Sequence, residues 1–271
     1  MMQIGNRNFE IGTHTYVMGI LNVTPDSFSD GGKFDQLDAA LHHVEEMIRE
    51  GADIIDVGGE STRPGYEQIS EEEEIARVVP VIEQIKARFD IPVSLDTYKE
   101  PVATAGIQAG VDLINDIWGL KGDEKMAAVI AKSGLPCCLM HNRKEAVYQN
   151  YIQDVLADLE ETLEIAEKAG IARDKILLDP GIGFAKTYEQ NLLLLQQLET
   201  MHSFGCPILL GTSRKSVIGL TLNVPAQERM VGTVATTVLG VIKGCSFVRV
   251  HDIKENVQAI KMTEAILYEG K

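Results

Sequence analysis

The sequence is poor in positive charge and has no long apolar run. Its 271 residues include 25 Lys and Arg against 40 Asp and Glu, which gives a formal net charge of -15. Nucleic acids and anionic membranes are bound chiefly through basic clusters, so we expect neither as a partner. No apolar run approaches the roughly 20 residues of a membrane-spanning helix, and no secretory signal pattern opens the chain. We therefore expect a cytoplasmic protein.

Cysteines are few, and several well-known motifs are missing. The four cysteines lie in or beside apolar segments without C-x-x-C spacing, which favours buried thiols over disulfides or a zinc site. There is no H-E-x-x-H motif, Walker-type loop or G-x-S-x-G elbow. These absences argue against a zinc protease, a P-loop nucleotide-binding protein and an α/β-hydrolase. No G-x-G-x-x-G turn follows the first expected strand, which disfavours a dinucleotide-binding fold.

The sequence does contain a regular alternation of short apolar strands and amphipathic helices. One unit carries Leu37, Leu41, Val44 and Ile48 at helical spacing and stops at Gly51 before the next strand. We expect eight strands, over residues 16–21, 53–57, 93–96, 113–117, 137–140, 176–178, 208–210 and 247–250. We expect eight helices, over residues 36–50, 71–89, 99–109, 124–133, 152–169, 187–203, 226–243 and 254–268.

This alternation predicts the fold class. Six inner helices end at a glycine suited to a left-handed cap, namely Gly51, Gly110, Gly134, Gly170, Gly205 and Gly244. Eight such units in about 250 residues predict an α/β fold, a single (β/α)8 TIM barrel, rather than a doubly wound sheet. We expect one domain over residues 1–271, with the barrel over 16–268. A hairpin within residues 1–15, turning near Gly5 or Gly12, is expected to cover the bottom of the barrel.

The residues at or just beyond the carboxyl ends of the expected strands stand where parallel barrels bind ligands. They are Asn22, residues 59–63, Asp96, Asn115, Met140 with His141, Asp179, Lys215 with Ser216, and Arg249 with His251. Arg249 and His251 alternate with Val250, so both point into the barrel mouth if Phe247 fills its interior. A single Arg or His is more often solvated or satisfied within the core. Here two such side chains share one face of a strand, opposite Lys215 and Arg63 in an acidic protein, and this arrangement indicates an anion site.

Asp96, Asn115 and Asp179 form the other half of this predicted ring. Carboxylates accept hydrogen bonds from ring N–H and amino groups, and an amide both donates and accepts, so the set suits a heterocycle such as a pterin or guanine. The alternative is that each Asp caps a following helix, which explains three in a ring poorly. Lys215 lies beyond its strand, where closing over a ligand is favoured over Schiff-base chemistry. An Asn22 oxygen beside a diphosphate would suit Mg²⁺.

Taken together, the motifs resemble the dihydropteroate synthase family, the folate-pathway enzymes that sulfonamides inhibit. The matching stretches are GILNVTPDSFSDGG at 19–32, GADIIDVGGESTRPG at 51–65, SLDT at 94–97, INDIWG at 114–119, LMH at 139–141, LLDPGIGFAKT at 177–187, LLGTSRKS at 209–216 and RVHD at 249–252. Each stretch lies on or just after an expected strand, and together they span nearly the whole barrel. The resemblance also implies a homodimer formed through barrel helices.

The resemblance implies that a dihydropterin-methyl group moves from its diphosphate onto the amine of 4-aminobenzoate. Its pterin contacts match Asp96, Asn115, Met140, Asp179, Gly211 and Lys215. Its diphosphate contacts match Asn22 with Mg²⁺, Thr62, Arg63, Arg249 and His251. Its 4-aminobenzoate contacts match Thr62, Pro64, Phe184, Lys215 and Ser216. Catalytic roles are expected for Asp96, Lys215, Arg249, His251 and Asp30, the last on an opening loop, residues 24–32, that we expect to act as a lid.

Two rival functions stay open from the sequence. A pterin-binding barrel methyltransferase shares the heterocycle pocket but needs no diphosphate site, so Arg249, His251 and the SRKS segment argue against it. A non-catalytic pterin-binding barrel would be expected to have damaged strand ends, whereas both polar sets are complete here.

Overall fold

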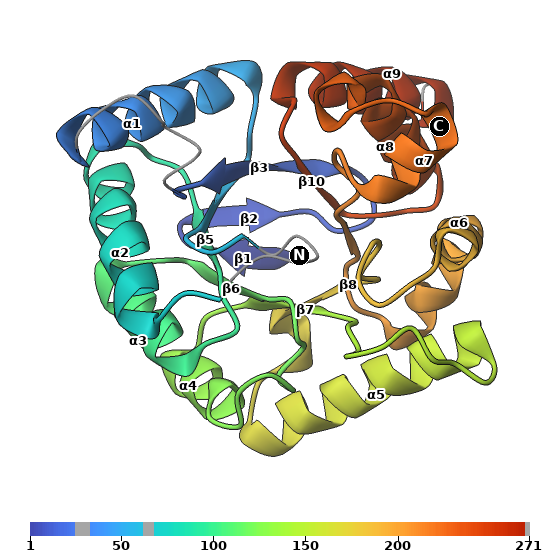
Figure 1. Ribbon diagram of the computed structural model, residues 1–271, viewed down its shortest axis with the longest axis horizontal. Coiled ribbons are helices and arrows are strands. Elements are labelled where there is room, and N and C mark those ends of the chain that lie inside the picture. Colours follow the sequence, from blue (N-terminus) through green and yellow to red (C-terminus); the bar gives the residue numbers. More distant parts are fainter. Residues whose placement is uncertain (25–32, 62–67, 269–271) are drawn as a thin grey trace.

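The computed structural model describes residues 1–24, 33–61 and 68–268, and its centre is one parallel sheet (Figure 1). The strands are β3 (Tyr16–Asn22), β4 (Ile54–Gly58), β5 (Val93–Asp96), β6 (Leu113–Asp116), β7 (Cys137–Met140), β8 (Ile176–Asp179), β9 (Leu209–Leu210) and β10 (Phe247–Val250). Their order in space is β8-β7-β6-β5-β4-β3-β10-β9, and a bridge between Leu178 and Ile208 joins the two outer strands. The expected barrel is confirmed.

Helices surround this sheet on the outside (Figure 1). They are α1 (Lys33–Glu50), α2 (Glu71–Arg88), α3 (Glu100–Ala109), α4 (Met126–Ser133), α5 (Tyr151–Ala169), α6 (Tyr188–Gln196), α7 (Ser216–Leu222), α8 (Met230–Ile242) and α9 (Ile253–Tyr268). The glycines expected to end helices do so, with φ between +67° and +106°. Such a residue reverses the chain without the steric cost of a Cβ, so each helix leads directly into the next strand.

The helix predictions were wrong in two places. The expected helix over 187–203 ends at Gln196, and a 3₁₀ helix (Leu198–Phe204) follows it. The expected helix over 226–243 is a 3₁₀ turn (Ala226–Glu228) and then α8, and the preceding α7 was missed. α7 has seven residues, contains Gly219 and ends at Asn223 with φ +55°, so its helical pattern is too short to stand out.

The barrel interior is apolar at the amino-terminal end of the strands. This lower layer consists of Met18, Ile54, Leu113, Cys138, Leu177, Leu209 and Phe247. The hairpin of β1 (Met2–Ile4) and β2 (Arg7–Phe9) packs against it, with the Phe9 and Phe247 ring centroids 5.5 Å apart. The chain turns at Gly5 and Asn6, since Ile4 pairs with Arg7. The hairpin therefore closes the bottom of the barrel, as expected.

Two residues further along the strands, the interior becomes polar. Ile54 is followed by Asp56, Leu113 by Asn115, and Leu177 by Asp179. Because side chains alternate along a strand, these polar residues face the same interior as the apolar ones below them. Arg249 stands in the same relation to Phe247. The fold thus carries a polar upper layer towards the carboxyl ends of the strands.

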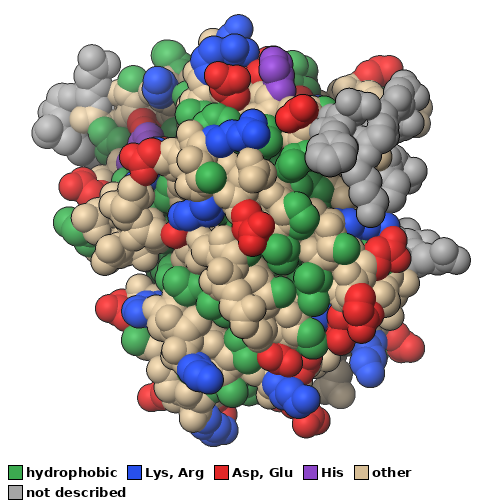
Figure 2. Space-filling view, turned by 90° about the vertical axis from the view of Figure 1, so that its left-hand side faces the viewer, with side chains coloured by type: hydrophobic (Ala, Val, Ile, Leu, Met, Phe, Trp, Pro, Cys, Tyr) green, Lys and Arg blue, Asp and Glu red, His purple; other side chains and the backbone are tan. Residues whose placement is uncertain are grey.

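The outer surface mixes charges of both signs. Figure 2, which faces the side of the molecule at the left of Figure 1, shows basic side chains scattered among acidic and apolar ones. The four cysteines are buried and unpaired, as expected. Within the residues that the structure describes, no helix is long and apolar enough to cross a membrane.

Candidate active site

The centre of the upper layer is one arginine between two carboxylates. Arg249 Nε donates to Asp56 Oδ2 at 2.5 Å, and Nη2 donates to Asp96 Oδ2 at 2.6 Å. Asn115 Nδ2 also donates to Asp56 Oδ2, at 3.3 Å. The other oxygens, Asp56 Oδ1 and Asp96 Oδ1, are buried and hydrogen-bond to no described residue. Buried acceptors are normally satisfied, so this pair marks a place where a ligand's N–H groups fit.

Burial controls the ionisation of this group. It raises the pKa of Asp96 to about 7, against the lowering effect of Arg249 and with the further raising effect of Asp56. Burial also raises the pKa of Asp179, while Lys215 and a backbone bond from Gly181 lower it. For Arg249, burial opposes the charge, but Asp56 and Asp96 raise its pKa above the ordinary value. The arginine therefore stays cationic, whereas Asp96 titrates near neutrality.

Lys215 lies across the barrel mouth beside Asp179. Its Nζ donates to the carbonyl of Ile182 at 2.6 Å and lies 4.7 Å from the centre of the Phe184 ring. A Cβ at Gly211 would lie 3.3 Å from Asp179 Oδ2 and 3.7 Å from Lys215 Nζ, so only glycine leaves this space open. Burial lowers the pKa of Lys215 to about 8, although Asp179 opposes this shift.

Asn22 and Met140 are the last residues of their strands. Asn22 pairs with Gly58, and a Cβ at Gly58 would lie 3.8 Å from Asn22 Oδ1 and 3.9 Å from Asp96 Oδ2. Gly58 also pairs with Asp96, so Asn22 and Asp96 lie on either side of this glycine. Met140 is buried and pairs with Asp179 across β7 and β8. Both side chains border the same mouth.

His251 is fixed by the loop after β9. The Ser213 hydroxyl lies 2.9 Å from His251 Nδ1 and accepts from the His251 backbone N–H at 3.2 Å. Ser216 opens α7 two residues after Arg214, whose guanidinium pairs with Asp252. The segment after β9 and the end of β10 therefore hold one another in place.

Some expected site residues lie outside the described part of the chain. These are Asp30, Thr62, Arg63 and Pro64. The same holds for residues 25–32 of the expected lid.

Sequence reasoning missed Asp56 and Ser213. Asp56 is fully buried and lies inside a strand, whereas the prediction used residues at strand ends. Its position two residues after Ile54 is the signal that was available, because alternate strand residues share the barrel interior. Ser213 was passed over because its partner, His251, is 38 residues away.

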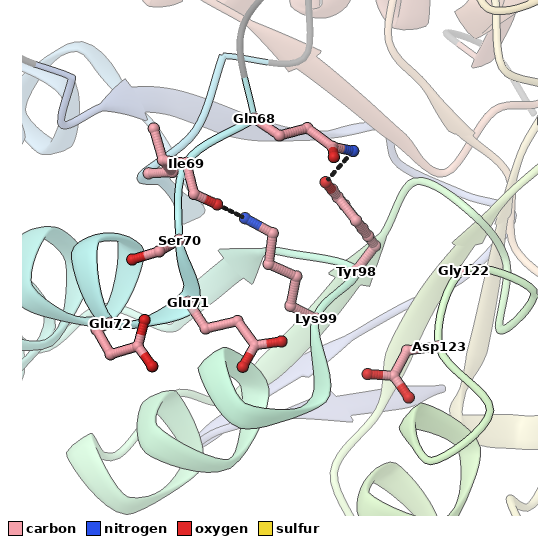
Figure 3. Close-up of a pocket in the computed structure, with 9 residues that line it drawn as sticks. All are labelled: Gln68, Ile69, Ser70, Glu71, Glu72, Tyr98, Lys99, Gly122 and Asp123. Atoms are coloured by element: carbon pink, nitrogen blue, oxygen red, sulfur yellow. Dashed lines mark hydrogen bonds between the residues drawn. The ribbon is translucent and has the colours of Figure 1, made fainter.

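A pocket of about 470 Å³ lies among residues that follow β4, β5 and β6 (Figure 3). It is lined by Gln68, Ile69, Ser70, Glu71, Glu72, Tyr98, Lys99, Gly122 and Asp123. Lys99 Nζ donates to the carbonyl of Ile69 at 2.9 Å, and Gln68 donates to the Tyr98 hydroxyl at 3.0 Å. None of the polar residues of the upper layer lines it. The upper layer, with its acceptor oxygens and cations, is the better candidate for chemistry.

Comparisons with known proteins agree with this assignment. The family model described as pterin binding enzyme matches residues 18–251. The chain is 63% identical over 267 residues to a dihydropteroate synthase of Clostridium beijerinckii, covering 98% of this chain and 99% of that one. It is 56% identical over 256 residues to a dihydropteroate synthase of Bacillus subtilis, covering 94% and 90%.

Solved structures are similar as well. A dihydropteroate synthase from Clostridium difficile, crystallised in the presence of pteroic acid, superimposes with a TM-score of 0.94 at 50% identity, covering 96% of this chain and 99% of that one. A Yersinia pestis dihydropteroate synthase in a sulfonamide drug complex gives 0.91 at 44% identity, covering 98% and 99%. This chain belongs to the dihydropteroate synthase family of pterin-binding enzymes.

Proposed function

We propose that the upper layer of this barrel joins a dihydropterin-methyl group to the amine of 4-aminobenzoate and releases diphosphate. The observation that carries the proposal is the presence, in one buried layer, of unpartnered acceptor oxygens on Asp56 and Asp96 together with the cations Arg249 and Lys215. Acceptors suit the N–H edge of a pterin, and cations suit a diphosphate.

The pterin would lie over the carboxylates. Asp96, Asn115 and Asp179 would bind its donor and acceptor edge, with Asp56 as a further acceptor at the base. Met140 is buried at one wall, and the absence of a side chain at Gly211 leaves room for a flat ring beside Lys215. This arrangement would hold the ring with its methylene group towards the cations.

The diphosphate would lie towards Arg249 and His251. In the step itself, the C–O bond to the diphosphate breaks, and the C–N bond to the arylamine forms. Arg249 would stabilise charge as it develops on the leaving group, while the pterin ring spreads positive charge from its methylene. A neutral arylamine is already nucleophilic, so the site needs no strong base, and its extra proton leaves after attack.

Asn22 is the residue we expect to hold Mg²⁺. Its amide oxygen stands at the end of β3, across Gly58 from Asp96, which fits a cation bound beside a diphosphate. The described residues contain no group of three or more His, Cys, Asp or Glu placed for a metal. Mg²⁺ suits such a site because it often takes few protein ligands and completes its octahedron with phosphate oxygens and water. When bound, it would add positive charge at the leaving group.

The second substrate would lie beside Phe184. That ring is 4.7 Å from Lys215 Nζ, so an aromatic carboxylate can pack on the ring while a cation stands close to it. Ser216 at the start of α7 borders the same place, and Thr62 and Pro64 are expected partners from outside the described residues.

The direct test is product formation. Purified protein is incubated with the pterin diphosphate, 4-aminobenzoate and Mg²⁺, and dihydropteroate and diphosphate are quantified by chromatography. We expect equal amounts of both products. A methyltransferase would transfer a methyl group from methyl-tetrahydrofolate to a corrinoid instead, and a non-catalytic barrel would bind the pterin without turnover.

A pair of variants tests the division of roles. Arg249→Ala should impair diphosphate release more than binding of a pterin that lacks the diphosphate. Asp179→Ala should do the reverse. Isothermal titration measures the binding of the pterin that lacks the diphosphate, and chromatography measures the diphosphate released. Equal losses of binding and of release in each variant would contradict these separate roles.

The homodimer and the cytoplasmic location stay predictions. Exposed apolar side chains on the outer helices support self-association, for example Leu220 on α7, Val231 on α8 and Met262 on α9. Sedimentation equilibrium of the purified chain measures the dimer directly.

A further inference from the structure

The β8–α6 loop, residues 180–187, is held by side chains from other elements. Lys215 Nζ donates to the Ile182 carbonyl at 2.6 Å, and the Tyr148 hydroxyl donates to the Ala185 carbonyl at 2.9 Å. Lys186, within the loop, donates to the Phe184 carbonyl at 3.0 Å. Phe184 is thus the residue between these anchors.

The backbone of this loop needs such support. Gly181 and Gly183 have φ of +71° and +84°, and Ala185 has φ of +43°. A residue with a Cβ rarely adopts this left-handed conformation, so Ala185 must be held there by its surroundings. The hydrogen bonds to the carbonyls of Phe184 and Ala185 fall on both sides of this strained position.

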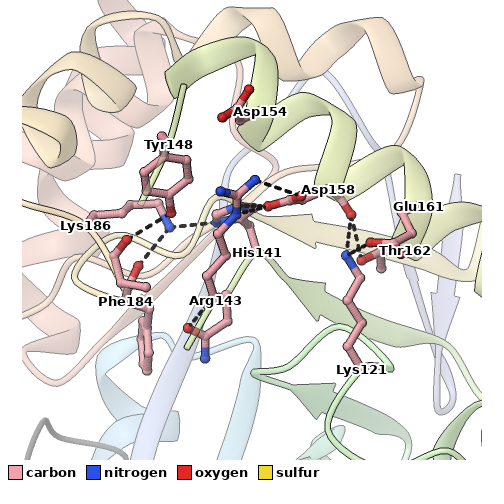
Figure 4. A network of polar contacts seen from close by, with 12 residues as sticks. Lys121, His141, Arg143, Tyr148, Asp154, Asp158, Glu161, Thr162, Phe184 and Lys186 are labelled. Carbon is pink, nitrogen blue, oxygen red and sulfur yellow. Dashed lines mark hydrogen bonds and ion pairs between the residues drawn. The ribbon is translucent and has the colours of Figure 1, made fainter. Parts of the chain in front are cut away.

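Lys186 is itself fixed by a chain of polar contacts (Figure 4). Its Nζ lies 2.8 Å from His141 Nδ1, and His141 Nε2 lies 3.0 Å from Asp158 Oδ2. Arg143 in turn donates to both Asp158 oxygens, from Nε at 2.5 Å and from Nη2 at 3.1 Å. The guanidinium also covers the Tyr148 ring at 4.3 Å. The network therefore joins the end of β7, helix α5 and the β8–α6 loop.

The direction of these bonds follows from the groups involved. The ionised carboxylate of Asp158 only accepts, so the His141 ring proton is on Nε2, facing Asp158, and Nδ1 accepts from Lys186 Nζ. Burial lowers the pKa of His141 to about 4, which keeps this ring neutral. The histidine side chain is fully buried, so its orientation is set by these two partners.

A contribution to stability does not by itself explain the presence of a lysine at position 186. No described carboxylate lies within ion-pair distance of Lys186 Nζ, and burial lowers its pKa to about 7. A partly buried cation without a paired carboxylate costs desolvation energy. Its hydrogen bonds instead go to His141 and to the loop carbonyl next to the expected second-substrate position.

We propose that Lys186 is a positioning residue for 4-aminobenzoate, fixing Phe184 of the β8–α6 loop through its carbonyl, with His141, Asp158 and Arg143 fixing Lys186. This inference rests on the proposed function, because it assigns Phe184 to the second substrate. Lys215 holds the loop from the side of the barrel mouth, and Lys186 holds it from the side of α5. Loss of Lys186 should therefore weaken the binding of 4-aminobenzoate and leave the binding of the pterin diphosphate unchanged.

The test uses Lys186→Met in the full chain. We expect the KM for 4-aminobenzoate to rise at least about tenfold at saturating pterin diphosphate. Both kcat and the Kd for the pterin diphosphate should stay within about twofold of the unaltered protein, which also shows that the barrel has folded. Asp158→Ala acts only indirectly, through His141 and through Arg143 beneath the partner ring Tyr148, so we expect a smaller rise, about threefold. The double variant should resemble Lys186→Met, since both changes break one chain of contacts.

Lys121→Met is the matched control. Lys121 also bonds to α5, donating to the Asp158 carbonyl at 2.8 Å and pairing with Glu161 at 2.7 Å, and its Nζ contacts neither His141 nor the β8–α6 loop (Figure 4). It should leave the KM for 4-aminobenzoate unchanged. If the network had a purely structural role, the two lysine variants would have the same KM for 4-aminobenzoate.

Three outcomes would overturn the inference. One is a pterin Kd in Lys186→Met that rises as much as the KM. Another is an unchanged KM with a lowered melting temperature, which would assign Lys186 to stability. The third is an equal effect in Lys121→Met. If the unaltered protein forms no dihydropteroate, the proposed function fails instead. Titration of 4-aminobenzoate in the presence of the pterin diphosphate then replaces KM, with the same tenfold weakening expected in Lys186→Met.

Discussion

The two layers of the barrel interior are built on the same strands and differ in what they leave unsatisfied. The lower layer, around Phe247, is apolar, buried and covered by the hairpin. The upper layer, two residues further along, holds Asp56, Asp96 and Arg249, with two carboxylate oxygens that bond to no described residue. The difference teaches that one backbone pattern can supply stability at one level and binding capacity at the next.

The first prediction tests whether the lower layer is purely structural. Phe247→Ala should reduce the free energy of unfolding by about 3–5 kcal/mol, because a large buried ring is replaced by a cavity. Urea unfolding measures this. The folded fraction at low temperature should keep its kcat/KM for dihydropteroate formation within about threefold. A tenfold loss in the folded protein would mean that the layers are not separable.

The second prediction concerns the upper layer, where a substitution should reduce activity strongly and change stability little. Asp96→Asn should lower kcat/KM about 100-fold, equivalent to about 2.7 kcal/mol of transition-state stabilisation. The free energy of unfolding should change by less than about 1 kcal/mol, because Asn keeps an acceptor for Arg249 and removes a carboxylate that burial disfavours. Steady-state kinetics and urea unfolding on one preparation give both values. A large loss of stability with little loss of activity would place Asp96 with the lower layer.

The third prediction concerns pH, to which the upper layer should respond near neutrality, whereas the apolar lower layer holds no group that titrates there. Burial raises the pKa of Asp96 to about 7 and lowers that of Lys215 to about 8. Asp96 becomes ionised as the pH rises through 7, and Lys215 loses its charge as the pH rises through 8. The profile of kcat/KM should therefore be bell-shaped, with a decline approaching about tenfold per unit well above pH 8. Lys215→Met should have low activity and lack the alkaline decline, and an unchanged decline would assign it to another group.

The smallest predicted effect is at the edge of the upper layer. Ser213→Ala removes the hydroxyl that lies 2.9 Å from His251 Nδ1. A single neutral hydrogen bond is worth about 1 kcal/mol, so we expect kcat/KM to fall roughly fivefold. The melting temperature should stay close to that of the unaltered protein. A fall of 100-fold would instead make Ser213 part of the reacting group.

Most of the fold could be predicted because strands, helices and their stops are local signals. The strand cores over 93–96, 137–140 and 247–250 were located without error, since apolar runs and flanking glycines mark them. α7 was missed because seven residues with an internal Gly219 carry too little periodicity. The break after Gln196 was missed because the apolar pattern continues into the 3₁₀ helix.

The candidate site was only partly accessible from sequence. Asp96, Asn115 and Asp179 could be named because they lie at or close to the carboxyl ends of strands, and the structure places all three in the buried upper layer. The partner of Arg249 could not be named, since Asp56 is 193 residues away in the chain. Lys186 meets His141 across 45 residues and two loops, and no local pattern encodes such a contact. Side-chain pairing between distant segments is what sequence periodicity leaves out.

The pairing of the first and last barrel strands has a consequence for synthesis. Tyr16 on β3 pairs with Phe247 on β10, and Asp56 receives its cation from the same late strand. Until residues 247–250 have been made, Asp56 and Asp96 lack Arg249, and β3 lacks the neighbour that β10 provides. Because Arg249 lies on β10, the same strand supplies the cation for these carboxylates and the neighbour for β3. Appearance of enzyme activity would report that this last strand has been inserted.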